Sequence, residues 1–158
     1  MLSVKQALQS VHFLKDVPEE AIEAIAAKCT EKVHFKGETI FMEGDPPRGL
    51  IVVREGAVKI FKLGDTGREQ ILEIEGPGRS VAELPLFDGL PYPASCATVA
   101  DSVILTVRVR EFHEILDRHP AVGKAIIATL SQRLRRMVML VRELSLKDVR
   151  GRLADLLV

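Results

Sequence analysis

The stretch that decides the fold is Pro77–Ala100, which reads PGRSVAELPLFDGLPYPASCATVA. Its opening Pro-Gly marks a turn, and the apolar run Val81–Leu84 that follows carries Glu83 as its one charge. A second turn region, Asp88–Pro93, leads into the small and β-branched residues Ala94–Val99. A carboxylate that faces the start of a small-residue strand across a turn can line a compact polar pocket. The alternative is an exposed glutamate in a loop between strands.

The residues on both sides of this stretch predict short β-strands separated by glycine-rich turns. Turn pairs such as Glu55-Gly56 recur between Cys29 and Val109, and Lys59–Leu63 alternates polar and apolar residues as a half-buried strand does. The strand-like runs are Val33–Phe35, Thr39–Phe41, Leu50–Val53, Ala57–Phe61, Glu69–Ile74, Ala97–Val99 and Val103–Val109. Short strands at this spacing predict an antiparallel barrel or roll.

Two short helices are expected before the strands. Ser3 and Gln6 form a capping-box pair, and Asp16 and Glu19 repeat the pattern with Pro18 tolerated in the first turn. Apolar residues recur on one face of each helix, so both helices must pack against another part of the chain.

The longest predicted element is a helix over about Pro120–Leu144. Its apolar residues recur at alternating steps of three and four, which is the a/d spacing of a coiled coil. These residues, called the dimer seam below, are Ile127, Leu130, Leu134, Met137, Val141 and Leu144. Further apolar residues at Ile126, Val138 and Leu140 let the helix cover its own domain as well, so the seam predicts a parallel homodimer. The alternative is one long helix packed on its own domain.

The C-terminal part of the chain is locally basic. Ser145 is expected to be a new N-cap that begins a last amphipathic stretch. The basic residues are Arg133, Arg135, Arg136, Arg142, Lys147, Arg150 and Arg152. They can face phosphate, or they can form a solvated helix face.

Composition excludes several function classes. The 22 Lys and Arg residues balance 22 Asp and Glu residues, so bulk charge predicts neither a nucleic-acid scavenger nor a membrane-surface binder. No apolar run has the length of a membrane span, and no signal peptide is expected. Cys29 and Cys96 lack CxxC spacing and are expected to be buried cytosolic thiols. No nucleophile–base set or P-loop is visible, so an enzyme is not expected, and the expected location is the cytoplasm.

In order and length, the elements resemble the Crp/Fnr family of transcription regulators. Phe41–Asp45 resembles the family's early roll turn, Val52–Val58 its hairpin, Gly78–Phe87 the start of its effector cassette, and Asp148–Ala154 the beginning of its DNA-binding domain. The resemblance implies an α+β fold: an antiparallel, jelly-roll-like β-roll of cyclic nucleotide-binding type, with short N-terminal helices and a long C-terminal dimerisation helix.

The resemblance also implies a division of the chain. Residues 1–119 would be the sensor domain, 120–145 the dimerisation helix, and 146–158 the start of a DNA-binding domain. In the family a winged helix-turn-helix follows, and here the chain stops at Val158. The chain is then expected to be a sensor fragment or a natural chain without a DNA reader. DNA would be bound only through the absent domain.

The resemblance implies that cyclic AMP is not the effector. Family members that bind it carry a glycine-glutamate pair and, further along, an arginine that pairs with the phosphate and a small hydroxyl residue. This chain has Ala82, Glu83, Pro93 and Ala94 at those positions, and Ser95 is the residue that could take the hydroxyl role. Losing the arginine removes a charge-assisted pair worth on the order of several kcal/mol. The candidate effector pocket is Ala82, Glu83, Leu84, Pro93, Ala94 and Ser95.

The cassette Phe87–Ser95 resembles more closely the branches that sense redox state, nitric oxide or carbon monoxide, some through haem. A haem needs an apolar slot and an axial ligand such as a neutral imidazole. His12 lies in SVHFLKDVP (residues 10–18), which resembles the histidine-bearing N-terminal segment of some haem-based nitric-oxide regulators. His12 is therefore the candidate axial ligand, or else an exposed histidine at a helix end. His34 is expected to point outward from a strand.

The expected function is that of an effector-sensing and dimerisation domain of a Crp/Fnr-type regulator. It would signal allosterically through the long helix and respond to a redox or nitrosative signal, or to a haem-bound gas, rather than to cyclic AMP. Its expected partners are a second copy of the chain and a small-molecule or gas effector. The alternatives are a domain that binds a cyclic nucleotide or another small anion, and a dimerisation module without a ligand.

Overall fold

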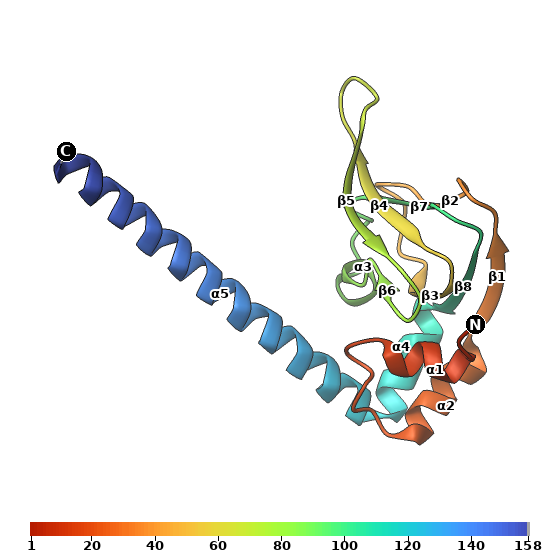
Figure 1. Cartoon of the computed structure of the whole chain (residues 1–158). Coiled ribbons are helices and arrows are strands. Elements are labelled where there is room, and N and C mark those ends of the chain that lie inside the picture. Colours follow the sequence, from red (N-terminus) through yellow and green to blue (C-terminus); the bar gives the residue numbers. More distant parts are fainter. Residues whose placement is uncertain (158) are drawn as a thin grey trace.

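The chain forms a β-roll flanked by short helices, from which one long helix projects (Figure 1). The computed structural model describes residues 1–157. In chain order the elements are α1 (Val4–Ser10), α2 (Glu19–Lys28), β1 (Thr30–His34), β2 (Thr39–Phe41), β3 (Gly49–Glu55), β4 (Val58–Leu63), β5 (Glu69–Glu75), β6 (Ser80–Val81), α3 (Leu84–Asp88), β7 (Ser95–Thr98), β8 (Ser102–Arg108), α4 (Val109–Arg118) and α5 (Pro120–Leu157).

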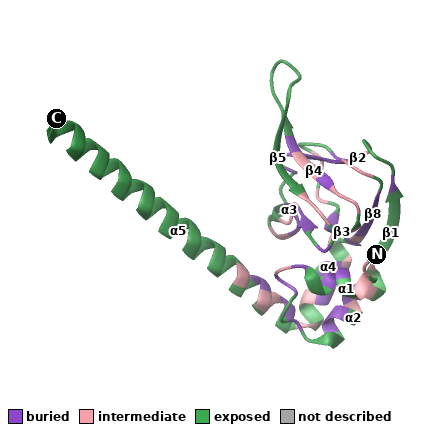
Figure 2. Cartoon of the chain, in the orientation of Figure 1, coloured by how far each residue is buried: buried purple, intermediate pink, exposed green. Residues whose placement is uncertain are grey.

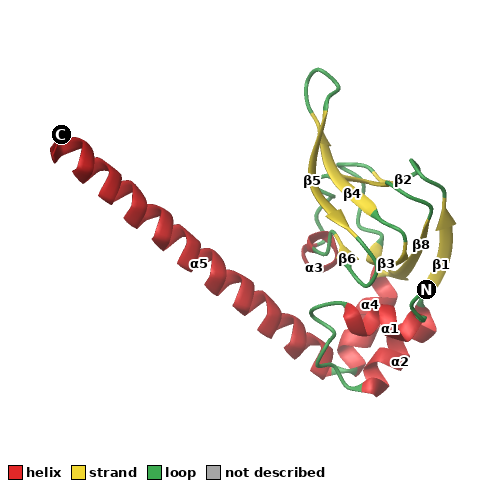
Figure 3. Cartoon of the chain, in the orientation of Figure 1, coloured by secondary structure: helices red, strands yellow, loops and turns green. Residues whose placement is uncertain are grey.

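Two four-stranded antiparallel sheets make the roll (Figure 3). One has the strand order β1-β8-β3-β6 and the other β2-β7-β4-β5. Buried residues of both sheets, among them Phe41, Val53 and Cys96, form one apolar cluster. The predicted α+β fold with an antiparallel roll and a long C-terminal helix is confirmed.

Strand β4 departs from its predicted alternation. The β4–β5 register shifts between Ile60 and Phe61, which is a β-bulge. As a result Val58 and Phe61 are buried, whereas Ile60 is only partly buried. The prediction of a clean alternation over Lys59–Leu63 was therefore wrong, because the bulge inserts a residue between the two buried positions.

The N-terminal helices begin in different ways. In α1 the backbone N–H of Gln6 donates to Ser3 Oγ over 3.1 Å, and the backbone N–H of Ser3 donates to Gln6 Oε1 over 2.9 Å. The predicted capping box is confirmed. The second box, Asp16 with Glu19, was wrong: Pro18 is the N-cap of α2 and no side chain caps that helix. Pro18 has φ −54° and ψ 146°, so the helix begins after it and Asp16 lies two residues before the N-cap.

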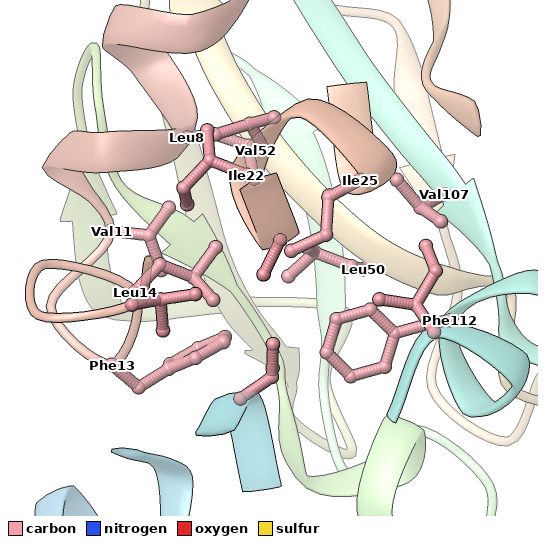
Figure 4. Close-up of a cluster of buried hydrophobic side chains, with 14 of the residues drawn as sticks. Leu8, Val11, Phe13, Leu14, Ile22, Ile25, Leu50, Val52, Val107 and Phe112 are labelled. Carbon is pink, nitrogen blue, oxygen red and sulfur yellow. The ribbon is translucent and has the colours of Figure 1, made fainter. Parts of the chain in front are cut away.

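A second apolar cluster joins these helices to the roll (Figure 4). Leu8 of α1, Ile25 of α2 and Phe112 of α4 contact the sheet that contains Leu50 of β3, and all four side chains are buried. Burying a side chain of this size stabilises the fold by about 1.5–3 kcal/mol. The first turns of α5 belong to the same cluster, so this end of α5 is anchored to the sensor.

Helix α5 is continuous from Pro120 to Leu157, so the prediction that a new helix begins at Ser145 was wrong. A serine caps a helix only where the backbone leaves the helical conformation. Ser145 lies between leucines and neither glycine nor proline is near it, so the helix runs through. The division between residues 120–145 and 146–158 stays a prediction. None of the helices within residues 1–157 is long and apolar enough to cross a membrane.

Beyond its first turns α5 is exposed along its whole described length (Figure 2). Val122 and Ile126 are its buried residues. The six side chains of the dimer seam are between 42% and 65% exposed in the single chain. The seam is therefore a large unpartnered apolar surface on this copy of the chain.

Candidate functional site

The segment between β6 and α3 has an unusual backbone conformation. Ala82 has φ +51°, and no other non-glycine residue within residues 1–157 has a positive φ. This conformation costs an L-residue such as alanine about 1–2 kcal/mol, whereas glycine adopts it freely. Ala82 is the position at which the resemblance to nucleotide-binding members predicts a glycine. The backbone conformation is thus present without the residue that favours it.

Glu83 is fixed next to this strained residue. It is the N-cap of α3, a short helix with Pro85 in its first turn that the sequence analysis did not predict. Ser80 Oγ donates a hydrogen bond to Oε1 of Glu83. Glu83 is partly buried, and Ser80, the first residue of β6, holds its carboxylate in place.

His12 lies at the centre of the candidate site. It follows α1 and forms part of the wall of each of three cavities. A guanidinium nitrogen of Arg133, on α5, contacts Nε2 of the His12 imidazole. Burial lowers the pKa of His12, and the positive charge of Arg133 lowers it further. Both effects favour the neutral imidazole, whose Nε2 can accept a hydrogen bond from Arg133.

The three cavities differ in chemistry. The first, called the apolar slot, has a volume of about 20 Å³ and separates Leu84 and Phe87 of α3 from Ile126 and Leu130 of α5. The second, called the acidic cleft, has a volume of about 210 Å³. Its lining residues are His12, Glu73, Glu75, Arg79, Ser80, Ala82, Glu83 and Arg133. The third, called the basic cavity, has a volume of about 730 Å³ and lies between the segment after α1 and α5.

The predicted effector pocket is divided by the structure. Ala82 and Glu83 line the acidic cleft, and Glu83 and Leu84 line the apolar slot. Pro93, Ala94 and Ser95 line none of the three cavities. Pro93 is exposed, Ala94 is buried, and the buried Ser95 Oγ accepts a hydrogen bond of 2.8 Å from the backbone N–H of Glu43.

Tyr92 fills the roll interior beside the cassette. Its ring stacks on Phe41 with a centroid distance of 3.7 Å and an interplanar angle of 14°. Its hydroxyl oxygen accepts a hydrogen bond of 3.1 Å from the backbone N–H of Arg48, and burial raises the pKa of that hydroxyl. Tyr92 was not predicted as part of the site, although it is the chain's one tyrosine and lies between two prolines of the cassette.

The other histidines do not offer a comparable site. His34 is buried, with Nδ1 3.0 Å from the Glu38 carboxylate, so the prediction that it points outward was wrong. The carboxylate satisfies the ring nitrogen and so allows the imidazole to be buried. His113 is exposed and places Nε2 2.9 Å from the carbonyl oxygen of Leu86, and His119 is the C-cap of α4. No cluster of three or more metal-ligating side chains occurs in the part of the chain that is described.

Comparison with known proteins supplies the family. The model of the cyclic nucleotide-binding domain matches residues 32–119, which include the whole roll after the start of β1. The chain belongs to this family. It is 30% identical over 150 residues to the CRP-like cAMP-activated global transcriptional regulator of Mycobacterium tuberculosis, a match that covers 94% of this chain and 66% of the relative. It is 29% identical over 123 residues to the transcriptional activator protein anr of Pseudomonas aeruginosa, with coverage of 78% and 50%.

Solved structures agree with the sequence relatives. The sensor domain of the transcriptional regulator DNR from Pseudomonas aeruginosa superposes with a TM-score of 0.74 at 27% identity, covering 85% of this chain and 90% of that one. The chain is thus a cyclic nucleotide-binding-like sensor domain of Crp/Fnr type, and its relatives are transcription regulators rather than enzymes. It spans two thirds or less of the length of these curated relatives.

Proposed function

We propose that this Crp/Fnr-type sensor domain is the effector-sensing and dimerisation part of a cytoplasmic transcription regulator, and that its effector acts between His12 and α5. The observation that carries the proposal is the contact between His12 and Arg133, at the meeting point of three cavities. In the family the DNA-binding domain follows the long helix. A ligand that separates His12 from Arg133 would therefore act directly on the element that leads to DNA.

The exposed seam of α5 supports a parallel homodimer. Val122 and Ile126 face the sensor, whereas Leu134, Val141 and Leu144 are each more than 60% exposed. The helix can consequently keep its attachment to the sensor and still offer the seam to a second copy. Coupling requires that the effector bind one arrangement of the two helices better than the other.

Haem bound through His12 is the first candidate effector. The types of residue present are those that bind haem. The His12 imidazole, whose pKa is lowered, lies beside an apolar slot lined by Phe13, Leu84, Phe87 and Leu130. The slot's volume of about 20 Å³ is far too small for a porphyrin, so haem would enter only if α5 moved away from α3. Bound there, the haem iron would supply a coordination site for a gas such as nitric oxide. His12 would also have to release Arg133, and both changes would displace α5.

The roll interior supports the exclusion of cyclic AMP. Pro93 replaces the phosphate-pairing arginine, and the stacked rings of Tyr92 and Phe41 occupy the space beside it. A sensor for a different small anion remains an alternative. The second candidate function is a dimerisation module without a ligand, which the filled roll interior favours.

The test is a visible absorption titration of the purified chain with haemin, in the ferric and reduced states and after addition of nitric oxide. The proposal predicts a saturable, sharp Soret band that shifts with the gas and is weakened in His12→Ala. The matched control is His119→Ala, whose ring lines none of the three cavities, and its spectrum should equal that of the unmodified chain. A broad, non-saturating spectrum would reject haem, and a band that is unchanged in His12→Ala would reject His12 as the ligand.

A further inference from the structure

The basic cavity collects positive charge from three separate segments of the chain. Lys15 comes from the segment after α1, Arg79 from the turn before β6, and Lys124, Arg133 and Arg136 from α5. Asp16 is the one carboxylate among the described residues that line the cavity. Its volume of about 730 Å³ is within the range of pockets that hold small molecules.

Most of this charge is not neutralised by the protein. Arg79 pairs with Glu75 over 3.3 Å, and Arg133 contacts the neutral His12. Within residues 1–157, Lys15, Lys124 and Arg136 have no carboxylate within the 4.0 Å of an ion pair. Like charges directed into one volume repel each other, and the same arrangement attracts an anion.

The geometry of α5 explains both the room and the charge. Residues four apart lie above one another on a helix, and two neighbouring rows of this kind form the α5 wall of the cavity. They are Ala121, Ala125, Thr129 and Arg133, and Lys124, Ala128, Gln132 and Arg136. The small side chains of Ala125, Ala128 and Thr129 leave space in the middle of this wall. The cationic side chains, Lys124, Arg133 and Arg136, lie toward its ends.

The cavity wall and the dimer seam are different faces of α5. None of the seam residues Leu134, Met137 and Val141 lines the cavity, and the seam residue Leu130 lines only the apolar slot. At 3.6 residues per turn, Gln132 lies about 160° and Ala128 about 120° around the helix from Leu134. Packing a second copy along the seam would therefore leave the cavity open.

We propose that the basic cavity binds a small polyanion with two or more phosphate groups, which joins the segment after α1 to α5. Lys15, Lys124 and Arg136 are separate points of positive charge, so one phosphate group cannot meet all of them as well as a chain of phosphates can. Arginine offers paired donors to phosphate oxygens, and lysine offers a point charge. This site is separate from the roll interior, but it shares His12, Phe13, Thr129 and Arg133 with the apolar slot. It is proposed for the chain without haem, since haem binding would displace α5, which forms one of its walls.

The test is isothermal titration calorimetry of the purified chain with inorganic tripolyphosphate at low ionic strength. We expect saturable binding with one tripolyphosphate per chain, weakened about tenfold in Lys124→Gln and in Arg136→Gln. The matched controls are Lys147→Gln and Arg142→Gln, which are exposed positions of the same helix outside the cavity and should bind as the unmodified chain does. All four side chains are exposed, and circular dichroism should show unchanged helix content.

Three results would overturn the proposal. The first is the absence of saturable binding to the unmodified chain. The second is an equal loss of tripolyphosphate affinity in Arg136→Gln and Arg142→Gln. That result would assign binding to the general positive charge of α5 rather than to the cavity. The third is equally tight binding of orthophosphate, which would show that one phosphate group is enough and that the ligand class is wrong.

Discussion

Replacing two adjacent seam residues by lysine should convert the proposed dimer into a monomer. Leu134 is 64% exposed and Met137 is 61% exposed in the single chain, and in a parallel pair of helices each would meet its own copy. The double variant Leu134→Lys, Met137→Lys removes this apolar contact and places equal charges opposite each other. The sensor fold should persist, because neither residue belongs to either apolar cluster.

The magnitude follows from the exposed fractions. Complete burial of a leucine or methionine side chain is worth about 1.5–3 kcal/mol, so burying the part still exposed contributes about 1–2 kcal/mol for each residue. A dimer contains four such side chains, which makes the loss about 4–8 kcal/mol before any repulsion between lysines. The dissociation constant should therefore rise by about a thousandfold or more.

Sedimentation equilibrium over a wide range of protein concentration measures this change directly. The control is Met139→Lys, Leu140→Lys, which introduces the same residues at exposed positions of α5 outside the seam and should stay dimeric. If the seam variant sediments as a dimer, or if the control dissociates equally, the assignment of the seam is wrong.

Three further predictions concern the fold. Ala82→Gly should raise the free energy of unfolding by about 0.5–1 kcal/mol in urea denaturation because it relieves a positive φ, and an unchanged value would contradict the strain. Gly49→Ala should prevent folding or lower the free energy of unfolding by several kcal/mol, because its Cβ would lie 1.9 Å from the carbonyl oxygen of Val107. Gly67→Ala is the control: no atom lies within 4 Å of its Cβ, so the free energy of unfolding should fall by only about 1 kcal/mol. Burial raises the pKa of Cys96 to about 12, so the folded state keeps a proton that the unfolded state loses above pH 9. The free energy of unfolding should therefore fall by up to about 1.4 kcal/mol per pH unit between pH 9 and pH 12. The fall should be smaller in Cys96→Ala.

The parts of the fold that the sequence predicted are those with local signals. The capping box at Ser3 and Gln6 needs residues only three positions apart, and it forms as expected. The turn glycines divide the strands correctly because positive φ values at positions such as Gly56 and Gly78 favour glycine whatever surrounds them. The helical period of α5 was likewise visible in the spacing of its apolar residues.

The features that the sequence could not predict depend on contacts between distant residues. His12 and Arg133 are 121 positions apart, so no spacing rule relates them. Phe41 is the last residue of β2 and Tyr92 precedes β7, so their stacking depends on the pairing of these two strands. The division of the predicted pocket also depends on contacts with other parts of the chain. Glu83 accepts a hydrogen bond from Ser80, whereas Ser95 accepts one from the backbone of Glu43.

In the proposed mechanism the effector acts between His12 and α5 and not inside the roll. An ¹⁵N-labelled sample of the chain, titrated separately with haemin and with cyclic AMP, tests it most directly by nuclear magnetic resonance. Haemin should shift or broaden the amide signals of His12, Phe13 and the first half of α5, whereas cyclic AMP should leave those of Tyr92 and Ser95 unchanged. Saturable shifts from Glu83 to Ser95 with cyclic AMP, and none at His12 with haemin, would contradict it.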